Sequence, residues 1–495
     1  MLASAAATTA DGGCELLLSQ LPAAAGQCLR LCAIPHQFDR EILAALQPDL
    51  AVEEREAIYC RLERLALVSP RGAMLAIHDT ARKYLFNKWL TAEGGAFQEA
   101  SERLRAFFAR QEAGTTGQAQ SDTLRRRMFH WIGADQPAGV AEFERLCRAD
   151  RKAARLSDCA SLIALVHEYD AILTGASQGA LLYHEAKLAA DRSDNDVAER
   201  LFRTALGNAS LRPGLRLKTR NRLGLLYSSE RRWDDAIAEL QIARATTPME
   251  PRQLPMIIHD LAVAWRGKGN RERSERLLEE AIALADVGEN LLCLATAWNS
   301  LGTLHRSFRD YPRAIGSYEK SLSYLERMND RFRRSAVYNN LGDVYAELSD
   351  WQKSQKYFEM SLEVSRAAAD TVGQAKTLTN LMRVYSNSQR KDEAISAGTT
   401  AFQYFLGLRD EFNAAAAILR IAKIHRSAKR VSQALEGYGK AIELYEAAGD
   451  KQAAQDVELE RATLIKPLGL PWWAWVFPLL LLLLATAIIV LIARS

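Results

Sequence analysis

Apolar residues recur along the chain with the spacing of amphipathic helices, and one version of the pattern repeats through its middle. Three segments show it most clearly: RLGLLYSSERRWDDAIAEL, NSLGTLHRSFRDYPRAIGSY and NNLGDVYAELSDWQKSQKYF. Each has a Leu-Gly pair, an aromatic residue or His three positions after the glycine, and a small residue twelve positions after it. A bulky residue follows four positions later, and a second small residue three positions after that. The pattern predicts a series of helix pairs.

Seven copies can be aligned on the glycine position, at intervals of 38, 38, 40, 40, 40 and 40 residues. The aligned residues are Ala186, Gly224, Ala262, Gly302, Gly342, Met382 and Ala422. Two antiparallel helices cross closely only where small residues lie at the crossing, and bulky residues then fill the space between pairs. Met382 is large where the other copies are small, and Gly398 is small where they are bulky. We therefore expect the sixth copy to pack loosely.

This arrangement resembles the tetratricopeptide repeat (TPR), in seven copies over about residues 179–449. Its 40-residue period exceeds the usual 34 or so and resembles the long repeats of kinesin light chains and of the adaptors that orient mitotic spindles. The resemblance implies an all-α superhelical solenoid whose first helices line a concave, peptide-binding groove. Residues 451–465 are then expected to form a helix that caps the array.

Asparagines recur on the first helices, where the groove is expected. They are Asn221, Asn299, Asn339, Asn340 and Asn380. In the families that the repeats resemble, groove asparagines hydrogen-bond the backbone of a bound peptide. An Asn side chain offers both a donor and an acceptor, which suits capture with little dependence on peptide sequence. The alternative is that these side chains bond within the array or face water.

The last two first helices also carry four basic residues: Arg383, Arg420, Lys423 and Arg426. The last three are spaced three residues apart, so they share one helix face. Three explanations stay open. The face is simply solvated, it binds an acidic peptide or the terminal carboxylate of a polypeptide, or it contacts anionic lipid.

Residues 15–90 follow a different pattern, which predicts three helices and then a tight hairpin with Pro70 and Gly72 at its turn. That order is typical of a winged helix. The segment also resembles the winged-helix region of the signal-transduction NTPases with numerous domains (STAND), because Ile77, His78 and Asp79 match their Met-His-Asp signature. In that family the histidine contacts nucleotide phosphates, and a TPR array often follows.

The STAND nucleotide site itself is not expected in this chain. Only fourteen residues precede the module, and no G-x-x-x-x-G-K-[ST] phosphate loop occurs. We therefore expect no cofactor, and we expect His78 to fasten the hairpin to the next helix. The helix that would enter a DNA major groove, about residues 52–66, is net acidic, which disfavours nucleic-acid binding.

Residues 472–493 read WWAWVFPLLLLLLATAIIVLIA and carry no charge. At about 1.5 Å per residue, a helix of this length spans the roughly 30 Å hydrocarbon layer of a bilayer. Three tryptophans cluster at one end, where indole rings prefer the headgroup zone. The N-terminus has no signal-peptide pattern. We therefore expect a single-pass C-terminal membrane anchor, with the bulk of the protein in the cytoplasm.

Composition narrows the function further. The charge is balanced, with 64 Lys and Arg against 60 Asp and Glu, which does not indicate a nucleic-acid partner. The seven cysteines include no CxxC pair, so we expect reduced thiols and no metal. No nucleophile elbow or paired-carboxylate motif occurs, so we expect no catalytic residues, no enzymatic activity and no small-molecule substrate.

The expected order is a disordered segment (1–14), a winged-helix-like domain (15–90), a helical connector (91–178), seven repeats (179–449), a capping helix (450–466), a linker (467–471) and a transmembrane helix (472–493). This organisation predicts a membrane-tethered scaffold that binds a protein or peptide ligand, of acidic character if the basic face takes part. The alternative is a regulatory relative or fragment of a STAND NTPase that acts with a nucleotide-binding partner in trans. A membrane-held transcription regulator is a third, weaker alternative.

Overall fold

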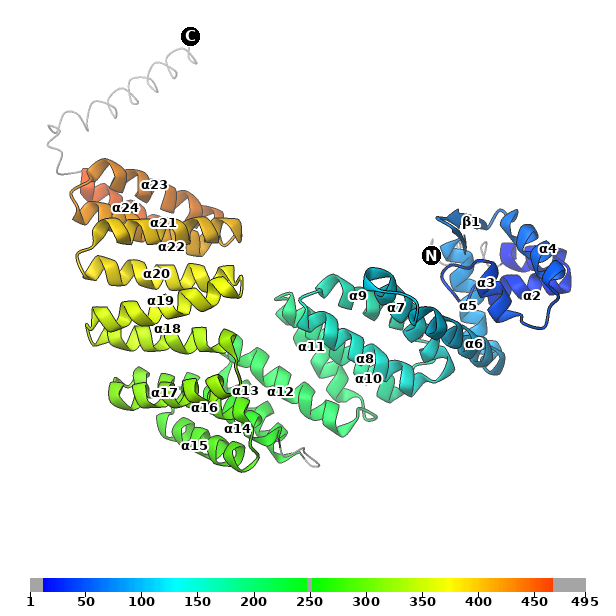
Figure 1. Ribbon diagram of the computed structural model, residues 1–495, viewed down its shortest axis with the longest axis horizontal. Helices are drawn as coiled ribbons and strands as arrows, with labels where there is room; N and C mark the ends of the chain where they lie inside the picture. The colour runs from blue at the N-terminus through cyan, green and yellow to red at the C-terminus, as the bar shows by residue number, and fades with distance from the viewer. Residues whose placement is uncertain (1–11, 247–251, 466–495) are drawn as a thin grey trace, which may run out of the picture. The chain divides into compact units, whose positions relative to one another are not determined.

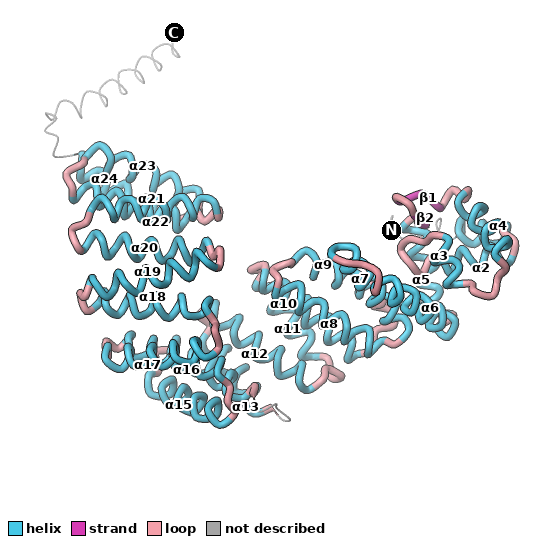
Figure 2. The backbone as a smooth tube through the Cα atoms, in the orientation of Figure 1, coloured by secondary structure: helices cyan, strands magenta, loops and turns pink. Residues whose placement is uncertain are grey.

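A computed structural model of the protein describes residues 12–246 and 252–465 (Figure 1). The protein divides into two compact units, residues 1–249 and residues 250–495. Within the described residues both consist of α-helices, apart from one β-hairpin near the N-terminus, shown in magenta in Figure 2. The expected all-α fold is therefore confirmed.

After a helical segment at residues 12–20, the first unit has α2 (Ala23–Leu31), α3 (Arg40–Leu46), α4 (Val52–Glu63), β1 (Val68–Arg71), β2 (Met74–Ile77) and α5 (Asp79–Ala92). It continues with α6 (Gly94–Glu112), α7 (Gly117–Ala134), α8 (Gln136–Lys152), α9 (Leu156–His167), α10 (Gly175–Asp191), α11 (Asn195–Gly207), α12 (Pro213–Ser229) and α13 (Trp233–Ala245).

The N-terminal helices and the hairpin occur in the order that the sequence predicts. Asp39 caps α3 by accepting a hydrogen bond from the backbone N–H of Ile42 at 2.8 Å. The β1–β2 turn contains Gly72, whose φ of 66° suits a residue without a Cβ. Phe38 adds a backbone bridge to Leu75, so the hairpin joins the segment before α3. The winged-helix assignment stays a prediction.

The role expected for the His78 side chain is wrong. That side chain is exposed and makes no capping hydrogen bond to α5. The attachment is made by the backbone instead: the His78 N–H donates to the carbonyl of Leu67 at the base of the hairpin, and the His78 carbonyl accepts from the N–H of Arg82 on α5, both at 2.8 Å. A different side chain holds α5, the helix that follows the hairpin. Buried Arg82 on α5 donates a hydrogen bond to Glu168, just after α9, at 2.9 Å.

The second unit stacks antiparallel helix pairs, as Figure 1 shows. Its helices are α14 (Leu254–Gly267), α15 (Arg271–Val287), α16 (Leu291–Ser307), α17 (Tyr311–Arg327), α18 (Arg331–Glu347), α19 (Trp351–Ala367), α20 (Thr371–Asn387), α21 (Lys391–Gly407), α22 (Glu411–Ser427), α23 (Val431–Ala447) and α24 (Lys451–Ile465). The even-numbered helices up to α22 are the first helices of their pairs, and the odd-numbered ones are the second. Helix α24 follows the last pair, where the sequence predicts a cap.

Helix starts in this unit follow a 20-residue rhythm. At most of these starts, the side chain of the residue just before the helix accepts a hydrogen bond from the backbone N–H three residues later. These residues are Asn270, Asn290, Asp310, Asp330, Asp350, Asp370, Asp410 and Asp450. Such caps satisfy an N–H that a helix start leaves without an intrahelical partner. Positions 390 and 430 of the same series are arginines. A short polar residue therefore caps the start of almost every helix in this series.

The small residues of the repeat lie where the helices cross. Each second helix has two small positions, and both are fully buried in all seven copies. The residues at the first of these positions are Ala198, Ala236, Ser274, Ala314, Ser354, Ala394 and Ala434. Where the position is serine, its hydroxyl is satisfied by the paired first helix: Ser354 donates to the carbonyl of Gly342 at 2.8 Å. A Cβ on Gly342 would lie 2.7 Å from the Phe358 ring, so the glycine permits this close approach.

The sixth copy does not pack loosely, contrary to expectation. Met382 is 1% exposed, and a Cβ on Gly398 would lie 2.5 Å from its sulfur. Methionine on the first helix thus fills the space that a bulky residue on the second helix fills in the other copies. The two departures from the pattern compensate each other, because the large and small partners have exchanged places.

The predicted membrane span lies outside the described residues. Within residues 12–246 and 252–465, no helix is both long enough and apolar enough to cross a membrane. The anchor therefore stays a prediction.

Candidate partner-binding site

Neighbouring first helices of the second unit contact one another directly. Asn340 on α18 donates from Nδ2 to the Oδ1 of Asn299 on α16, at 2.9 Å. Two of the predicted groove residues therefore meet across adjacent repeats. The corresponding second helices contact one another less closely. This difference in spacing puts the first helices on the inner side of the array.

A row of charged side chains crosses the same inner face. Asp343 on α18 accepts from Arg306 on α16 at 3.0 Å and from Arg383 on α20 at 2.5 Å. Arg306 also pairs with Glu347, at 2.7 Å. Three successive first helices are thus joined by one carboxylate, and Arg383 is held by it in a fixed place.

The other predicted asparagines lie in different environments. Asn339 donates to the Ser361 and Thr377 hydroxyls, so its amide joins the repeat interior rather than a groove. Asn380 is half-buried and, among the described residues, has no hydrogen-bond partner for its side chain. Asn221 lies on α12, in the first unit. Of the five, Asn380 and the Asn340–Asn299 pair fit an accessible site.

The predicted basic residues gather around a pocket of about 250 Å³ between α20 and α22. Arg383, Arg420 and Lys423 line it together with Met382, Ser386, Asn387, Ile424 and Ser427. Arg420 is exposed and has no acidic partner among the described residues. The pocket therefore combines an apolar floor with three cationic groups, one of them without an ion-pair partner.

Glu460 on α24 neutralises part of the basic face. It pairs with Lys423 at 3.0 Å and with Arg426 at 3.2 Å, and accepts from the Tyr438 hydroxyl at 3.0 Å. Burial raises the pKa of Glu460, but the hydrogen bonds from Lys423 and Tyr438, together with the positive charges of Lys423 and Arg426, lower the pKa overall. The capping helix thus orients two of the four predicted basic residues, and Arg426 faces Glu460 rather than the pocket.

Protein-family models match this unit in three places, residues 256–285, 297–331 and 333–405, and each model is described as a tetratricopeptide repeat. The chain is a tetratricopeptide-repeat protein. The matched TPR pairs carry Asn299, Asn340 and Arg383. TPR repeats imply a scaffold for protein–protein interaction.

The fold is similar to that of a solved structure. A STAND protein with a TPR sensor, from Pyrococcus horikoshii, is similar with a TM-score of 0.52 and 14% identity, over 94% of this chain and 65% of that one. This TPR chain thus spans less than two thirds of that protein. Aspartyl phosphate phosphatase F from Bacillus subtilis is similar at 14% identity and a TM-score of 0.47, over 72% of this chain and 92% of that one. A search of curated protein sequences finds no match.

Sequence reasoning missed the residue that organises the site. Asp343 and Arg383 occupy the same place in successive TPR copies, one position after the aligned Gly342 and Met382. Aligning the copies was therefore enough to bring the two together as an ion pair between repeats. A search restricted to asparagines and basic residues leaves out the carboxylate that holds them.

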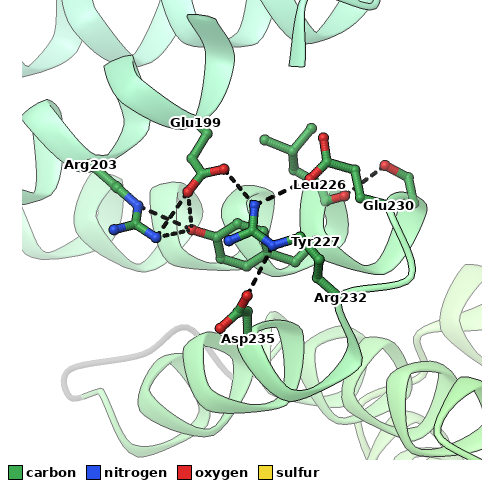
Figure 3. A network of polar contacts seen from close by, with 8 residues as sticks. Glu199, Arg203, Leu226, Tyr227, Glu230, Arg232 and Asp235 are labelled. Carbon is green, nitrogen blue, oxygen red and sulfur yellow. Dashed lines mark hydrogen bonds and ion pairs between the residues drawn. The ribbon is translucent and has the colours of Figure 1, made fainter. Parts of the chain in front are cut away.

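The first unit has a polar network of its own, around Tyr227 on α12 (Figure 3). Tyr227 donates to Glu199 at 3.0 Å and accepts from Arg203 at 2.9 Å, and the Arg232 guanidinium stacks 4.2 Å from its ring centre. Arg232 also pairs with Glu199 at 2.6 Å and with Asp235 at 2.9 Å. The hydrogen bond from Arg232 holds the pKa of Glu199 below its usual range. These charges bind one another across α11, α12 and α13, so the network joins helices rather than forming a vacant site.

Proposed function

We propose that this TPR protein is a membrane-tethered scaffold that binds an acidic segment of a protein partner on the inner face of its second unit. The observation that carries the proposal is the pocket between α20 and α22, where Arg383, Arg420 and Lys423 converge over Met382 and Ile424. A carboxylate is the natural counter-ion for such a group, and arginine can bind it through two parallel hydrogen bonds.

Arg420 is the residue that would bind the ligand most strongly. Arg383 and Lys423 already pair with Asp343 and Glu460, so they contribute orientation and residual positive charge. Arg420 has no such competitor within residues 252–465. Asn380 lies one turn before Arg383 on the same helix, where its free amide is placed to bond a peptide backbone.

A library of random peptides with free C-termini, displayed on phage and selected against the full-length protein in detergent, tests this binding. We expect enrichment of Asp and Glu, and loss of that enrichment with Arg420→Glu. Arg409→Glu is the matched control, because Arg409 is also exposed but lies in the loop before α22. Enrichment without acidic residues, or enrichment that survives Arg420→Glu, would overturn the proposal.

The tether rests on the uncharged segment 472–493. Its length matches the hydrocarbon layer, and its tryptophans suit one headgroup zone. We place the TPR array on the cytoplasmic side of the membrane. Detergent-phase partitioning is the direct test: recovery of the full-length protein in the aqueous phase would remove the tether from the proposal.

A second candidate function is regulation of a STAND-type NTPase supplied in trans. The observation that favours it is exposed His78, in the position of the family's phosphate-contacting histidine. The His78→Ala variant should then lose the ability to alter nucleotide hydrolysis by a purified STAND nucleotide-binding domain. An unchanged hydrolysis rate on adding the wild-type protein would reject this candidate.

A further inference from the structure

The second unit has two opposite edges, each made of one set of interhelical loops, drawn in pink in Figure 2. The first edge is formed by the loops that follow the first helices: residues 268–270, 308–310, 348–350, 388–390 and 428–430. The second edge is formed by residues 288–290, 328–330, 368–370, 408–410 and 448–450. Helices of 17 residues connect them, so the edges lie about 25 Å apart.

The two edges differ in charge. Counting each loop with three residues on either side, the first edge carries 13 Lys and Arg against 6 Asp and Glu, and the second carries 6 against 9. Arg309 and Lys429 are exposed loop residues of the first edge and have no acidic partner among the described residues. A negatively charged surface is therefore attracted to the first edge and repelled by the second.

Exposed apolar side chains accompany the basic charge. Phe308 and Leu348 occupy the same loop position in successive repeats and are 44% and 46% exposed. The second edge also exposes apolar groups, including Phe332 and Phe412. Phe412 follows Asp410 and Glu411, whereas Phe332 lies between Arg331 and Arg333. The two edges therefore differ in their overall charge rather than in exposed apolar groups.

Helix α24 leads the backbone toward the first edge. Glu460, near the end of α24, pairs with Lys423 and Arg426, which lie near the end of α22. The two helices therefore run in the same direction, and α24 ends beside the loop at 428–430. The six residues from 466 to 471 reach at most about 20 Å before the uncharged segment begins.

We propose that the first edge rests on the anionic headgroups of the membrane, with the helices of the second unit standing on it. This inference rests on the tether proposed above. The tether would bring the first edge within about 20 Å of the headgroups, and basic residues on it gain attraction once they come within a Debye length, about 8–10 Å. The second edge would then point away from the bilayer and leave the inner face open to a soluble partner.

Fluorophores at two matched positions test the orientation. Ser349 and Ala369 are both exposed loop residues with positive φ, one on each edge. Each is replaced by Cys in the full-length protein with Cys60→Ser, because the other native cysteines are buried. The labelled proteins are placed in nanodiscs of phosphatidylcholine alone or mixed with phosphatidylserine, with a spin label on the lipid headgroup. In the anionic discs we expect quenching at 349 at least about threefold stronger than at 369, given the short range of headgroup contact.

Charge reversal on each edge completes the test. Arg309→Glu with Lys429→Glu should reduce quenching at 349, whereas Arg409→Glu on the second edge should leave it unchanged. Equal quenching at both positions in proteins that do insert, or quenching at 349 that does not depend on phosphatidylserine, overturns the inference and leaves the tether standing. Failure of the protein to enter nanodiscs overturns the tether as well.

Discussion

At the scale of single residues, the loops of the second unit share one backbone feature. One residue in each adopts a left-handed conformation, and only two of the ten are glycines, Gly269 and Gly449. The others include Arg309, Ser349 and Ala369, with φ of 60°, 60° and 52°. A left-handed conformation costs a residue with a Cβ about 1–2 kcal/mol. The array therefore stores a small, repeated strain at its turns.

Replacing a strained loop alanine by glycine should stabilise the protein. For Ala369→Gly, relief of the left-handed strain exceeds the entropy that glycine loses on folding, so we expect a gain of about 0.5–1 kcal/mol in unfolding free energy. Ala336→Gly is the control, because Ala336 is exposed within α18 and glycine there should cost about 1 kcal/mol. Chemical denaturation of the two variants should give opposite signs. A loss for Ala369→Gly would mean that the left-handed loop is not strained.

Asn380 offers a separate prediction about binding. Its amide has no partner among the described residues, so Asn380→Ala should leave the melting temperature unchanged. If it bonds a peptide backbone, affinity for peptides selected on the wild-type protein should fall about tenfold, the value of one hydrogen bond of roughly 1–1.5 kcal/mol. Asn340→Ala, by contrast, should lower the melting temperature, because Asn340 donates a hydrogen bond to Asn299. Calorimetric titration beside thermal melting separates the two effects, and unchanged affinity for Asn380→Ala places the backbone contact elsewhere.

At the scale of helices, stability depends on matching one small and one large residue at each crossing. In six of the seven copies the small partner is on the first helix and the bulky one on the second, as for Gly302 and Tyr318 or Gly342 and Phe358. Copy six reverses them with Met382 and Gly398, while copy seven keeps Tyr438 opposite Ala422. Volume at the crossing, rather than residue identity at one position, is what the repeat maintains.

The exchanged pair should therefore be energetically coupled. Met382→Gly alone leaves a cavity and should cost about 2–5 kcal/mol, and Gly398→Leu alone overpacks the crossing and should cost about 1–3 kcal/mol. Together they restore the arrangement of Gly224 and Leu240, so the double variant should lose at least about 1 kcal/mol less than the sum. Ile421 also lies close to Gly398, which limits full recovery. Additive losses in denaturant titrations would mean that the two residues do not share one space.

Periodicity predicts the helix pairs well because burial repeats with the fold. Positions such as Ala314 and Ala394 must be small in every copy, so they stand out in the sequence. The site is harder to predict, since Asn339 and Asn340 are neighbours in sequence yet one faces the interior and the other faces the next helix. A rotation of about 100° per residue decides between these environments, and a sequence pattern of polar residues does not record it. The same limit explains the error at His78, whose backbone makes the contact expected of its side chain.

At the scale of the whole molecule, the repeat pattern runs through a division between two units. The copies aligned at Ala186 and Gly224, each 38 residues before the next, lie in the first unit, and the copies from Ala262 onward, 40 residues apart, lie in the second. Both units bury histidines, but in different surroundings. His130 and His184 in the first unit, both about 2% exposed, have no acidic partner among the described residues, and burial lowers the pKa of each. His259 and His305 in the second unit lie beside Asp260 and Glu275, at 3.0 and 3.2 Å. A buried histidine without an acidic partner makes folding sensitive to acid, so the two units should respond differently to pH.

The first unit should lose stability in mildly acidic solution. Burial, reinforced by Lys187, lowers the pKa of His184 to about 3, against about 6.5 in an unfolded polypeptide. A depressed histidine pKa gives stability that is complete above pH 6.5 or so and declines as the pH falls toward 3, because the unfolded state then binds the proton. Between pH 7 and pH 5 this one group should cost about 2 kcal/mol. His184→Leu keeps an apolar contact to Phe143, whose ring lies 5.4 Å from the histidine ring, and should reduce the loss. Calorimetric melts at both pH values, with proteolysis assigning each transition to a unit, would check this. A pH response that is identical in His184→Leu and the wild-type protein would show that His184 is not the residue that titrates.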